Sequence, residues 1–552
     1  MPLEDGWAAV GNVWKSKAAS ATKGTNMVIT SLQFIIFCVI LTVIYFLIPG
    51  SWQWILLLGF SMYFYTRSGY PALVLLLVTA LAAFLTGLWM EKELERSKEQ
   101  LAQCEDRAQK AAVREASRKK RRIGFILMCF VIFGIWVVTK YSSMFINTIA
   151  PLLSGEQMTG AMTFVDRLIV PLGISFYTFN CAGYVIDVSR KKYPAEKNPL
   201  RFLLYVSFFP HIIQGPFSRF DRLGKTLFAP HRFDWDRMCA GMARILYGYC
   251  EKVLVADKLS PTVSAVLADP AKTPGIYLVV AILSYGIQLY ADFSGYMNIM
   301  CGLCQVLGIE LEENFRQPYF AVSIQNYWKR WHITLGNWYS DYVFYPASMG
   351  KTAQKIGRKA RERFGPRMGK LLPSYFAMIF VWTLTGLWHG ASWTFVVWGW
   401  LNFAIIVFSM QAAPGYDWMK KKLHIRDTHL LWRIFQVIRT ILLVSLLRVF
   451  YCSPTVGAAI DYIRMMFTSN WSLLITAPKK VLLTACADKG ITLKYILAGT
   501  LAIFIVDLVK ESGKKFHIPM PVRMVFWGLL FCVLLMGASG NSSVGAFMYA
   551  QY

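Results

Sequence analysis

Residues 371–413 read LLPSYFAMIFVWTLTGLWHGASWTFVVWGWLNFAIIVFSMQAA, a run of 43 positions that contains no Asp, Glu, Lys or Arg. A single helix of that length, at about 1.5 Å per residue, would be about twice as long as a bilayer is thick. The run therefore predicts two membrane-spanning helices, and Gly390-Ala391-Ser392 is the natural break between them.

The composition of the whole chain points the same way. Of its 552 residues, 56% are hydrophobic and only 16% are charged, whereas a soluble domain has about 25% charged residues. Too little polar sequence is present to cover the surface of a soluble protein, so that class is excluded. Apolar stretches at 27–48, 72–90, 123–139 and 276–291 belong to an expected total of ten or eleven spans. We predict an all-α, polytopic, multi-pass protein of the plasma or inner membrane.

The net charge of +27 comes from 58 Lys and Arg against 31 Asp and Glu. Many of the basic residues lie in blocks between the apolar stretches, notably at 91–122 and 351–370, as the positive-inside rule predicts for cytoplasmic loops. Such blocks also contact anionic membrane lipids, and no nucleic acid partner is expected. Residues 91–122 are rich in helix formers and are predicted to form a charged cytoplasmic insert, a solvated helical hairpin. Docking of a partner or of lipid is the alternative for this segment.

Two of the seven histidines have unusual settings. His389 lies within the uncharged run, where an ionisable side chain is costly and indicates function by default. The alternative is that it bonds a carbonyl freed at the helix break. His332 lies in an amphipathic, Trp-rich stretch that is also typical of an interfacial helix. Neither has an obvious Ser or Cys partner, so they suggest general base catalysis on an incoming hydroxyl, for which the ordinary histidine pKa of about 6.5 is suited.

Other catalytic patterns are missing from the sequence. It contains no H-E-x-x-H, no Walker A and no G-x-S-x-G motif. The one C-x-x-C, at Cys301 and Cys304, has no second pair and no nearby His, so no metal is expected.

Several motifs, taken in order along the chain, resemble those of the membrane-bound O-acyltransferase (MBOAT) family. They are Pro171-Leu-Gly-Ile-Ser-Phe-Tyr177, Phe209-Pro-His-Ile-Ile-Gln-Gly-Pro216, Asp292-Phe-Ser-Gly-Tyr296, Asn314-Phe-Arg-Gln-Pro-Tyr319, Trp328-Lys-Arg-Trp-His332 and Gly386-Leu-Trp-His-Gly390. The set resembles the branch that holds the bacterial alginate O-acetylation membrane protein and the teichoic-acid D-alanyl transferase. Together the motifs are specific, although any one alone would be weak.

The resemblance implies an organisation and a reaction. Residues 1–90 would be N-terminal transmembrane helices, and 123–552 a catalytic core with a re-entrant segment near 314–350 and an aromatic tail. An acyl group would pass from a thioester to a hydroxyl, with His389 as the intramembrane base and His332 as the second family histidine. Trp331, Trp388 and Asn326 are candidates to line a tunnel or to position the substrate.

The aromatic C-terminal tail is similar to the ending of this branch. The family implies that Tyr549 carries the acyl group transiently, but Ala550 departs from the aromatic pattern and Tyr552 is a rival hydroxyl. An ordinary interfacial aromatic tail is an equally good interpretation.

The expected activity is O-acetylation of an exported cell-surface polysaccharide. The donor would be acetyl-CoA, or a phosphopantetheine carrier protein, and the basic block at 351–370 would suit its phosphates. Delivery would go through an extracytoplasmic esterase-like acetyltransferase partner. The first alternative is D-alanyl transfer from a carrier protein to teichoic acid, and the second is a polysaccharide transporter or scaffold without covalent chemistry. The absence of an internal repeat argues against transporters built from duplicated halves.

Overall fold

The computed structural model describes residues 27–152, 155–168, 171–268, 270–468, 491–513 and 520–539. Within these ranges the regular structure is helical, apart from one isolated antiparallel bridge between Phe315 and Trp331. The chain forms two compact units. The N-terminal unit takes in the described parts of 27–242 and 300–312, and the C-terminal unit those of 243–299 and 313–539.

The N-terminal unit is built from a run of helices of very different lengths. They are α2 (Leu32–Leu47), α3 (Gln53–Thr66), α4 (Tyr70–Gln103), α5 (Arg107–Ile149), α6 (Gly155–Arg167), α7 (Ile174–Ser189), α8 (Pro199–Ser207), α9 (Phe209–Ile212) and α10 (Phe220–Leu227), with the 3-10 turns η1 (Gly50–Trp52) and η2 (Ala150–Leu152). Helix α11 (Trp235–Cys250) begins here and continues into the C-terminal unit. Residues Ile36, Val39 and Val43 of α2 are about half exposed, as suits contact with lipid rather than water.

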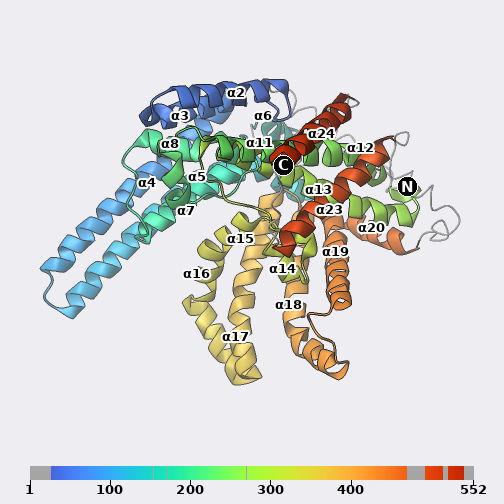
Figure 1. Ribbon diagram of the computed structural model, residues 1–552. Helices are drawn as coiled ribbons and strands as arrows, with labels where there is room; N and C mark the ends of the chain where they lie inside the picture. Colours follow the sequence, from blue (N-terminus) through green and yellow to red (C-terminus); the bar gives the residue numbers. More distant parts are fainter. Residues whose placement is uncertain are drawn as a thin grey trace. The chain divides into compact units, whose positions relative to one another are not determined.

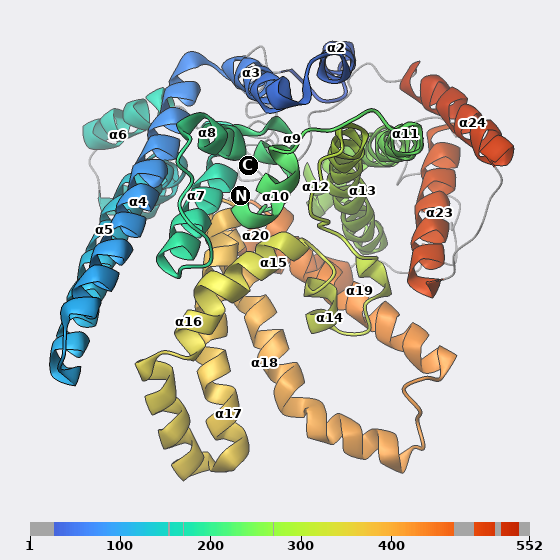
Figure 2. The ribbon, with the colours of Figure 1, turned by 60° about the vertical axis from the view of Figure 1, so that its left-hand side comes forward.

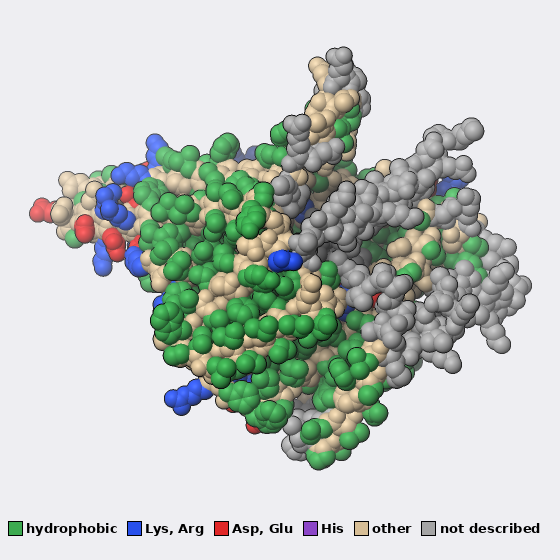
Figure 3. Space-filling model, turned by 90° about the horizontal axis from the view of Figure 1, so that it is seen from above, with side chains coloured by type: hydrophobic (Ala, Val, Ile, Leu, Met, Phe, Trp, Pro, Cys, Tyr) green, Lys and Arg blue, Asp and Glu red, His purple; other side chains and the backbone are tan. Residues whose placement is uncertain are grey.

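The charged segment 91–122 lies at the far ends of α4 and α5, which run side by side as a helical hairpin (Figures 1 and 2). The turn between them is at Cys104–Asp106. Lys, Arg, Asp and Glu side chains gather at this end, while the rest of the face in Figure 3 is largely hydrophobic. The segment is therefore a helical hairpin, as the composition predicts, and its cytoplasmic placement stays a prediction.

Two of the sequence motifs meet in the N-terminal unit. Gly173, at the start of α7, has a left-handed φ of 69°, and a Cβ there would lie 2.0 Å from the carbonyl oxygen of Ile212. Only glycine fits such an approach, so the Pro171–Tyr177 motif is locked against the Phe209–Pro216 motif.

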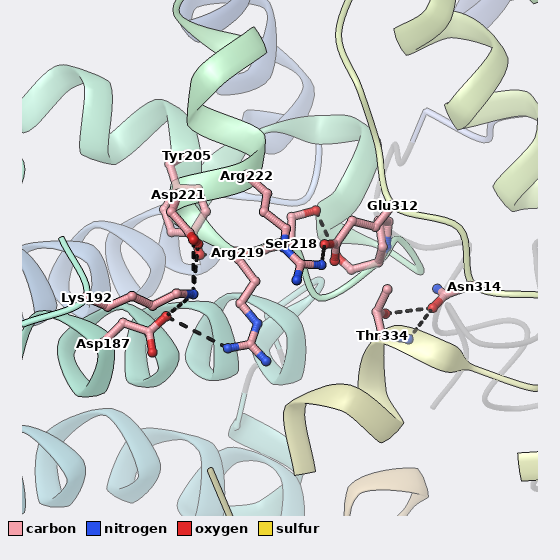
Figure 4. Close-up of polar contacts among 11 residues, drawn as sticks. Asp187, Lys192, Tyr205, Ser218, Arg219, Asp221, Arg222, Glu312, Asn314 and Thr334 are labelled. Carbon is pink, nitrogen blue, oxygen red and sulfur yellow. Dashed lines mark hydrogen bonds and ion pairs between the residues drawn. The ribbon is translucent and has the colours of Figure 1, made fainter. Parts of the chain in front are cut away.

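Ion pairs stabilise the segments of chain before and after the Phe209–Pro216 motif (Figure 4). Lys192 lies 3.2 Å from Asp187 and 3.0 Å from Asp221, and Arg222 pairs with Glu312 at 2.6 Å. The Tyr205 hydroxyl donates to the carbonyl oxygen of Ser218 at 2.9 Å. In the N-terminal unit these contacts thus hold the chain around the Phe209–Pro216 motif in place.

The C-terminal unit holds four of the six long apolar helices of the described ranges. Its elements are α12 (Asp257–Ala268), α13 (Gly275–Leu307), α14 (Ile324–Trp328), α15 (Ile333–Tyr339), α16 (Tyr345–Ser348), α17 (Lys351–His389), α18 (Trp393–Lys422), α19 (Leu430–Cys452), α20 (Val456–Thr468), α23 (Ile491–Ser512) and α24 (Met520–Ser539), with 3-10 turns η4 (Pro270–Lys272) and η5 (Pro318–Phe320) and π-turns η3 (Glu251–Ala256) and η6 (Ser340–Phe344). The last turns of α13 belong to the other unit.

The uncharged run folds as the sequence predicts. Helix α17 ends at His389 and α18 begins at Trp393, so the break at Gly390-Ala391-Ser392 is confirmed. Helix α17 itself folds back at Gly365, whose φ is 84°, so its basic first part and its apolar second part run side by side (Figure 2).

Six helices in the described ranges are long and apolar enough to cross a membrane. They are Tyr70–Ala102, Arg107–Ile149, Gly275–Leu307, Lys351–His389, Trp393–Lys422 and Leu430–Cys452, and two shorter apolar helices are Leu32–Leu47 and Met524–Leu535. Two further apolar stretches of the sequence form only short helices. Residues 52–65 lie in η1 and the 14-residue α3, and residues 202–215 are divided between α8 and α9 at Phe208. Pro210 falls in the first turn of α9, where proline is tolerated, so the chain restarts there instead of continuing α8.

Glycines set the spacing between α17 and α18, and this spacing gives a testable prediction. A Cβ at Gly386 would lie 2.5 Å from the carbonyl oxygen of Phe395, and one at Gly399 would lie 2.4 Å from that of Trp382. We expect Gly386→Ala and Gly399→Ala each to destabilise the protein by about 1–3 kcal/mol through overpacking, measured by thermal unfolding in detergent. Gly415→Ala on α18 is the control, since a Cβ there has nothing within 4 Å. Equal stability of the Gly386 and Gly415 variants would contradict the prediction.

Candidate active site

His389 is the last residue of α17 and is buried, with 4% of its surface exposed. The rings of Trp388, Trp398 and Tyr451 surround it, with centroids at 4.8, 5.0 and 5.3 Å. Its Nδ1 lies 3.3 Å from the Tyr451 hydroxyl. The chain can leave the helix directly after His389 because Gly390 has no side chain, and a Cβ there would lie 2.2 Å from the Phe395 ring. The helix break thus places an imidazole in an aromatic enclosure.

A small cavity of about 20 Å³ adjoins this imidazole. It has room for about one water-sized group. Five helices, α13, α14, α17, α18 and α19, and the Trp331 turn supply its lining, which is Leu289, Tyr327, Trp328, Trp331, His389, Trp398, Asn402, Val444, Leu447, Arg448 and Tyr451. The indole nitrogen of Trp328 donates to Asn402 Oδ1 at 3.0 Å, which fixes one wall. A base beside a small enclosed space is suited to proton transfer away from bulk water.

His332 lies close by and contacts the same tryptophan, Trp388. It precedes α15 with a left-handed backbone, φ 50° and ψ 51°, and is 3% exposed. Its ring contacts Phe293 and Trp388, with centroids at 5.0 and 5.3 Å. Burial lowers the pKa of His332 to about 3, so its imidazole is neutral at physiological pH. The two histidines therefore share Trp388 as a common neighbour, and only His389 lines the cavity.

Asn314 holds His332 in its strained backbone conformation through the two residues that follow it, and Figure 4 shows its contacts with Thr334. The Asn314 carbonyl accepts from the Ile333 amide at 3.0 Å, and Asn314 Oδ1 accepts from the Thr334 amide at 3.2 Å and the Thr334 hydroxyl at 2.6 Å. A non-glycine residue in this region persists only where its surroundings determine it, as these three bonds do.

The three predicted positioning residues have different places. Trp331 lines the cavity, and Trp388 contacts both histidine rings. The Asn326 side chain instead accepts from the Val322 amide at 3.4 Å, at the start of α14, and is not in the cavity lining. Tyr549 and Tyr552 lie outside the described residues.

A comparison with protein families settles the class of the molecule. The model of the membrane-bound O-acyltransferase family matches residues 60–358, which is more than half of the chain. The chain belongs to the MBOAT family. With its long apolar helices it is a multi-pass membrane protein.

Individual MBOAT relatives carry names for acyl transfer to envelope polymers. The chain is 37% identical over 235 residues to "Probable alginate O-acetylase AlgI" of Azotobacter vinelandii, a match that covers 43% of each protein. It is 28% identical over 331 residues to a peptidoglycan O-acetyltransferase of Helicobacter pylori, covering 55% of this chain and 58% of that protein. It is 29% identical over 317 residues to a teichoic acid D-alanyltransferase of Bacillus subtilis, covering 55% and 73%. The chain thus spans less than half the length of the alginate relative.

The candidate site contains residues that the sequence analysis missed, chiefly Arg448 and Tyr451. Both lie on α19 three positions apart, hence on one face of the helix, and both line the cavity. An arginine inside an apolar helix is itself a signal of function.

Within the described ranges, no group of three or more His, Cys, Asp and Glu is arranged to hold a metal ion. The first part of α17 exposes a basic face, which includes Lys355, Arg358 and Lys359. Its opposite face is packed through Gly357 against Gly369 and Pro373.

Proposed function

We propose that this protein is an O-acyltransferase that takes an acetyl group from a cytoplasmic thioester for O-acetylation of an exported cell-surface polysaccharide. The acetyl group would cross the membrane at the cavity and pass to an extracytoplasmic esterase-like partner. The observation that carries the proposal is His389, buried at a helix break and opening on a small enclosed cavity in an MBOAT protein. Two of the relatives are named for O-acetylation of alginate and of peptidoglycan.

The proposed chemistry assigns a role to each part of this site. The Tyr451 hydroxyl beside Nδ1 orients the imidazole, so Nε2 of His389 is the nitrogen that takes the proton of the attacking hydroxyl. The hydroxyl oxygen forms a bond to the thioester carbonyl carbon, the carbon–sulfur bond breaks, and the proton passes from His389 to the departing thiolate. His332 and Trp388 act as positioning residues that fix the wall behind His389. Tyr549, or Tyr552, is the hydroxyl we propose as a transient acyl carrier.

The donor is proposed to be acetyl-CoA. The basic face of α17 offers Lys355, Arg358 and Lys359 to a phosphate-bearing molecule. After the fold-back at Gly365, the same helix continues to His389. A phosphopantetheine carrier protein would use the same charges. D-alanyl transfer is therefore the second candidate, and the match to 73% of the Bacillus subtilis D-alanyltransferase favours it.

The donor can be tested with the purified full-length protein in liposomes. We expect label from [¹⁴C]acetyl-CoA to appear on the protein, or on an added alginate oligosaccharide, with release of free coenzyme A thiol. A carrier protein loaded with D-[¹⁴C]alanine should transfer no label. The reverse result would support D-alanyl transfer, and transfer from neither thioester would contradict covalent catalysis and leave a transporter or scaffold as the better account. Empty liposomes are the control for spontaneous hydrolysis.

A further inference from the structure

Arg448 is a buried cation in the middle of an apolar helix. Only 4% of its surface is exposed, and α19 is one of the six helices able to cross a membrane. Among the described residues no carboxylate forms an ion pair with it. Its guanidinium instead faces the rings of Trp331, Tyr319 and Tyr327, with centroids at 5.5, 5.7 and 5.9 Å. Its Nη2 donates to the Tyr327 hydroxyl at 2.7 Å, whereas Nη1 has no hydrogen-bond acceptor within the described part of the chain.

Lys252, a second buried cation among the described residues of this unit, has a different environment. Lys252 lies between Asp257 and Asp292, with Nζ at 2.8 Å from each carboxylate. The fold thus neutralises one buried positive charge with acid side chains and surrounds the second with aromatic faces and the phenol groups of Tyr327 and Tyr319. Cation–π contacts are weaker than the desolvation penalty of a buried charge. Arg448 is therefore left with unused capacity for a negative partner that is absent from the resting protein.

The position of Arg448 indicates where that partner forms. Arg448 lines the same cavity as His389 and Tyr451, and Tyr451 is the residue that contacts His389 Nδ1. Space for the guanidinium is provided by Gly286 of α13, since a Cβ there would lie 2.3 Å from Nη1. The Tyr319 hydroxyl donates to the Gly286 carbonyl oxygen at 2.5 Å, which holds this part of α13 against the aromatic wall. The donor group is thus held in place before any substrate arrives.

We propose that Arg448 is a catalytic residue that stabilises the oxyanion formed on the thioester carbonyl oxygen during acyl transfer. The inference rests on the proposed function. When the acceptor oxygen bonds to the carbonyl carbon, the carbonyl π pair moves onto its oxygen, and the guanidinium of Arg448 donates an N–H hydrogen bond to that anion. When the carbon–sulfur bond breaks, the carbonyl re-forms and the hydrogen bond weakens. Arg448 keeps its proton throughout, because the proton of the acceptor travels by His389. The cavity's volume suits a single oxygen centre and is too small for a phosphate.

The test uses full-length protein in liposomes and the thioester that supports transfer by the wild type. We expect Arg448→Met to lower kcat by about 10²- to 10³-fold, with the KM for the thioester within threefold of the wild type. Arg448→Lys keeps the charge and should retain more activity than Arg448→Met. The control is Arg439→Met on the same helix, because Arg439 donates to the Val322 carbonyl oxygen and is not in the cavity lining. Its kcat should match the wild type.

The outcomes separate this inference from the function it rests on. A wild type that transfers acyl groups, with an Arg448→Met variant within threefold in kcat, overturns the role of Arg448 alone. A rise in KM without a loss of kcat also overturns it, because Arg448 would then bind an anionic part of the donor. A wild type that transfers nothing overturns the proposed function and this inference together. If Arg448→Met unfolds, the same comparison is made with Arg448→Lys, which should still lose at least tenfold in kcat because its ammonium does not reproduce the guanidinium geometry.

Discussion

Replacement of His389 by alanine is expected to lower acyl transfer by about 10²- to 10⁴-fold, the usual contribution of a general base. The imidazole lines the cavity, with Nδ1 beside the Tyr451 hydroxyl. The other titratable side chains in the described lining are those of Tyr327, Tyr451 and Arg448. Tyrosine and arginine are poor bases at neutral pH, because the phenolate form of tyrosine and the uncharged form of arginine are scarce there. The loss should appear in kcat, measured as thiol release from the thioester.

A matched control is available for this prediction. His429 is an exposed histidine just before α19 and makes no capping hydrogen bond with its side chain, so His429→Ala should keep wild-type activity. Because His389→Ala leaves space among the rings of Trp388, Trp398 and Tyr451, its thermal unfolding must be compared with the wild type. Full transfer by a folded His389→Ala protein would refute the assignment of His389 as the base.

His389 is the part of the site that the sequence predicts best. An ionisable group in a long uncharged run is conspicuous, and glycine and serine next to it indicate the helix break that the structure confirms. The cavity around it cannot be predicted in the same way, because its walls come from Leu289, Tyr327, Trp398 and Arg448, which are far apart in sequence. Period and composition describe one helix at a time and carry no information on which helices meet. Arg448 nevertheless had a local signal, which is its charge within the otherwise largely apolar sequence of α19.

The segment around His332 shows a different limit of sequence reasoning. Its amphipathic pattern is compatible with one interfacial helix, yet the structure has two short helices, α14 and α15, with a bend between them. The bend exists because Asn314, from the preceding loop, captures the amides of Ile333 and Thr334, and Phe315 forms a bridge with Trp331. These are long-range hydrogen bonds that local periodicity does not encode. They turn His332 toward Phe293 and Trp388 and away from solvent.

Replacement of Lys252 by methionine is expected to destabilise the protein by about 3–5 kcal/mol, because it removes the buried cation that two carboxylates contact. Asp257 and Asp292 are both buried and both lie 2.8 Å from Lys252 Nζ. Lys252 stands in the π-turn η3, one of the places where an extra residue in a helix re-aims a side chain. Unfolding by denaturant in detergent micelles should show the loss directly. Lys420→Met is the control, since Lys420 pairs with exposed aspartates and should cost less than about 1 kcal/mol.

Restoring charge balance in the same site gives the sharper form of this test. Adding Asp257→Asn and Asp292→Asn to Lys252→Met removes both unpaired charges, so the triple variant should recover most of the lost stability. A triple variant no more stable than Lys252→Met would show that packing, and not charge, accounts for the loss.

The result also bears on catalysis, because Asp292 is the first residue of the Asp292–Tyr296 motif. In that motif Gly295 packs against the Gly248 carbonyl, and Phe293 supports His332. We therefore expect the triple variant to regain acyl transfer along with stability, since α13 can then hold Phe293 against His332 without an uncompensated buried charge.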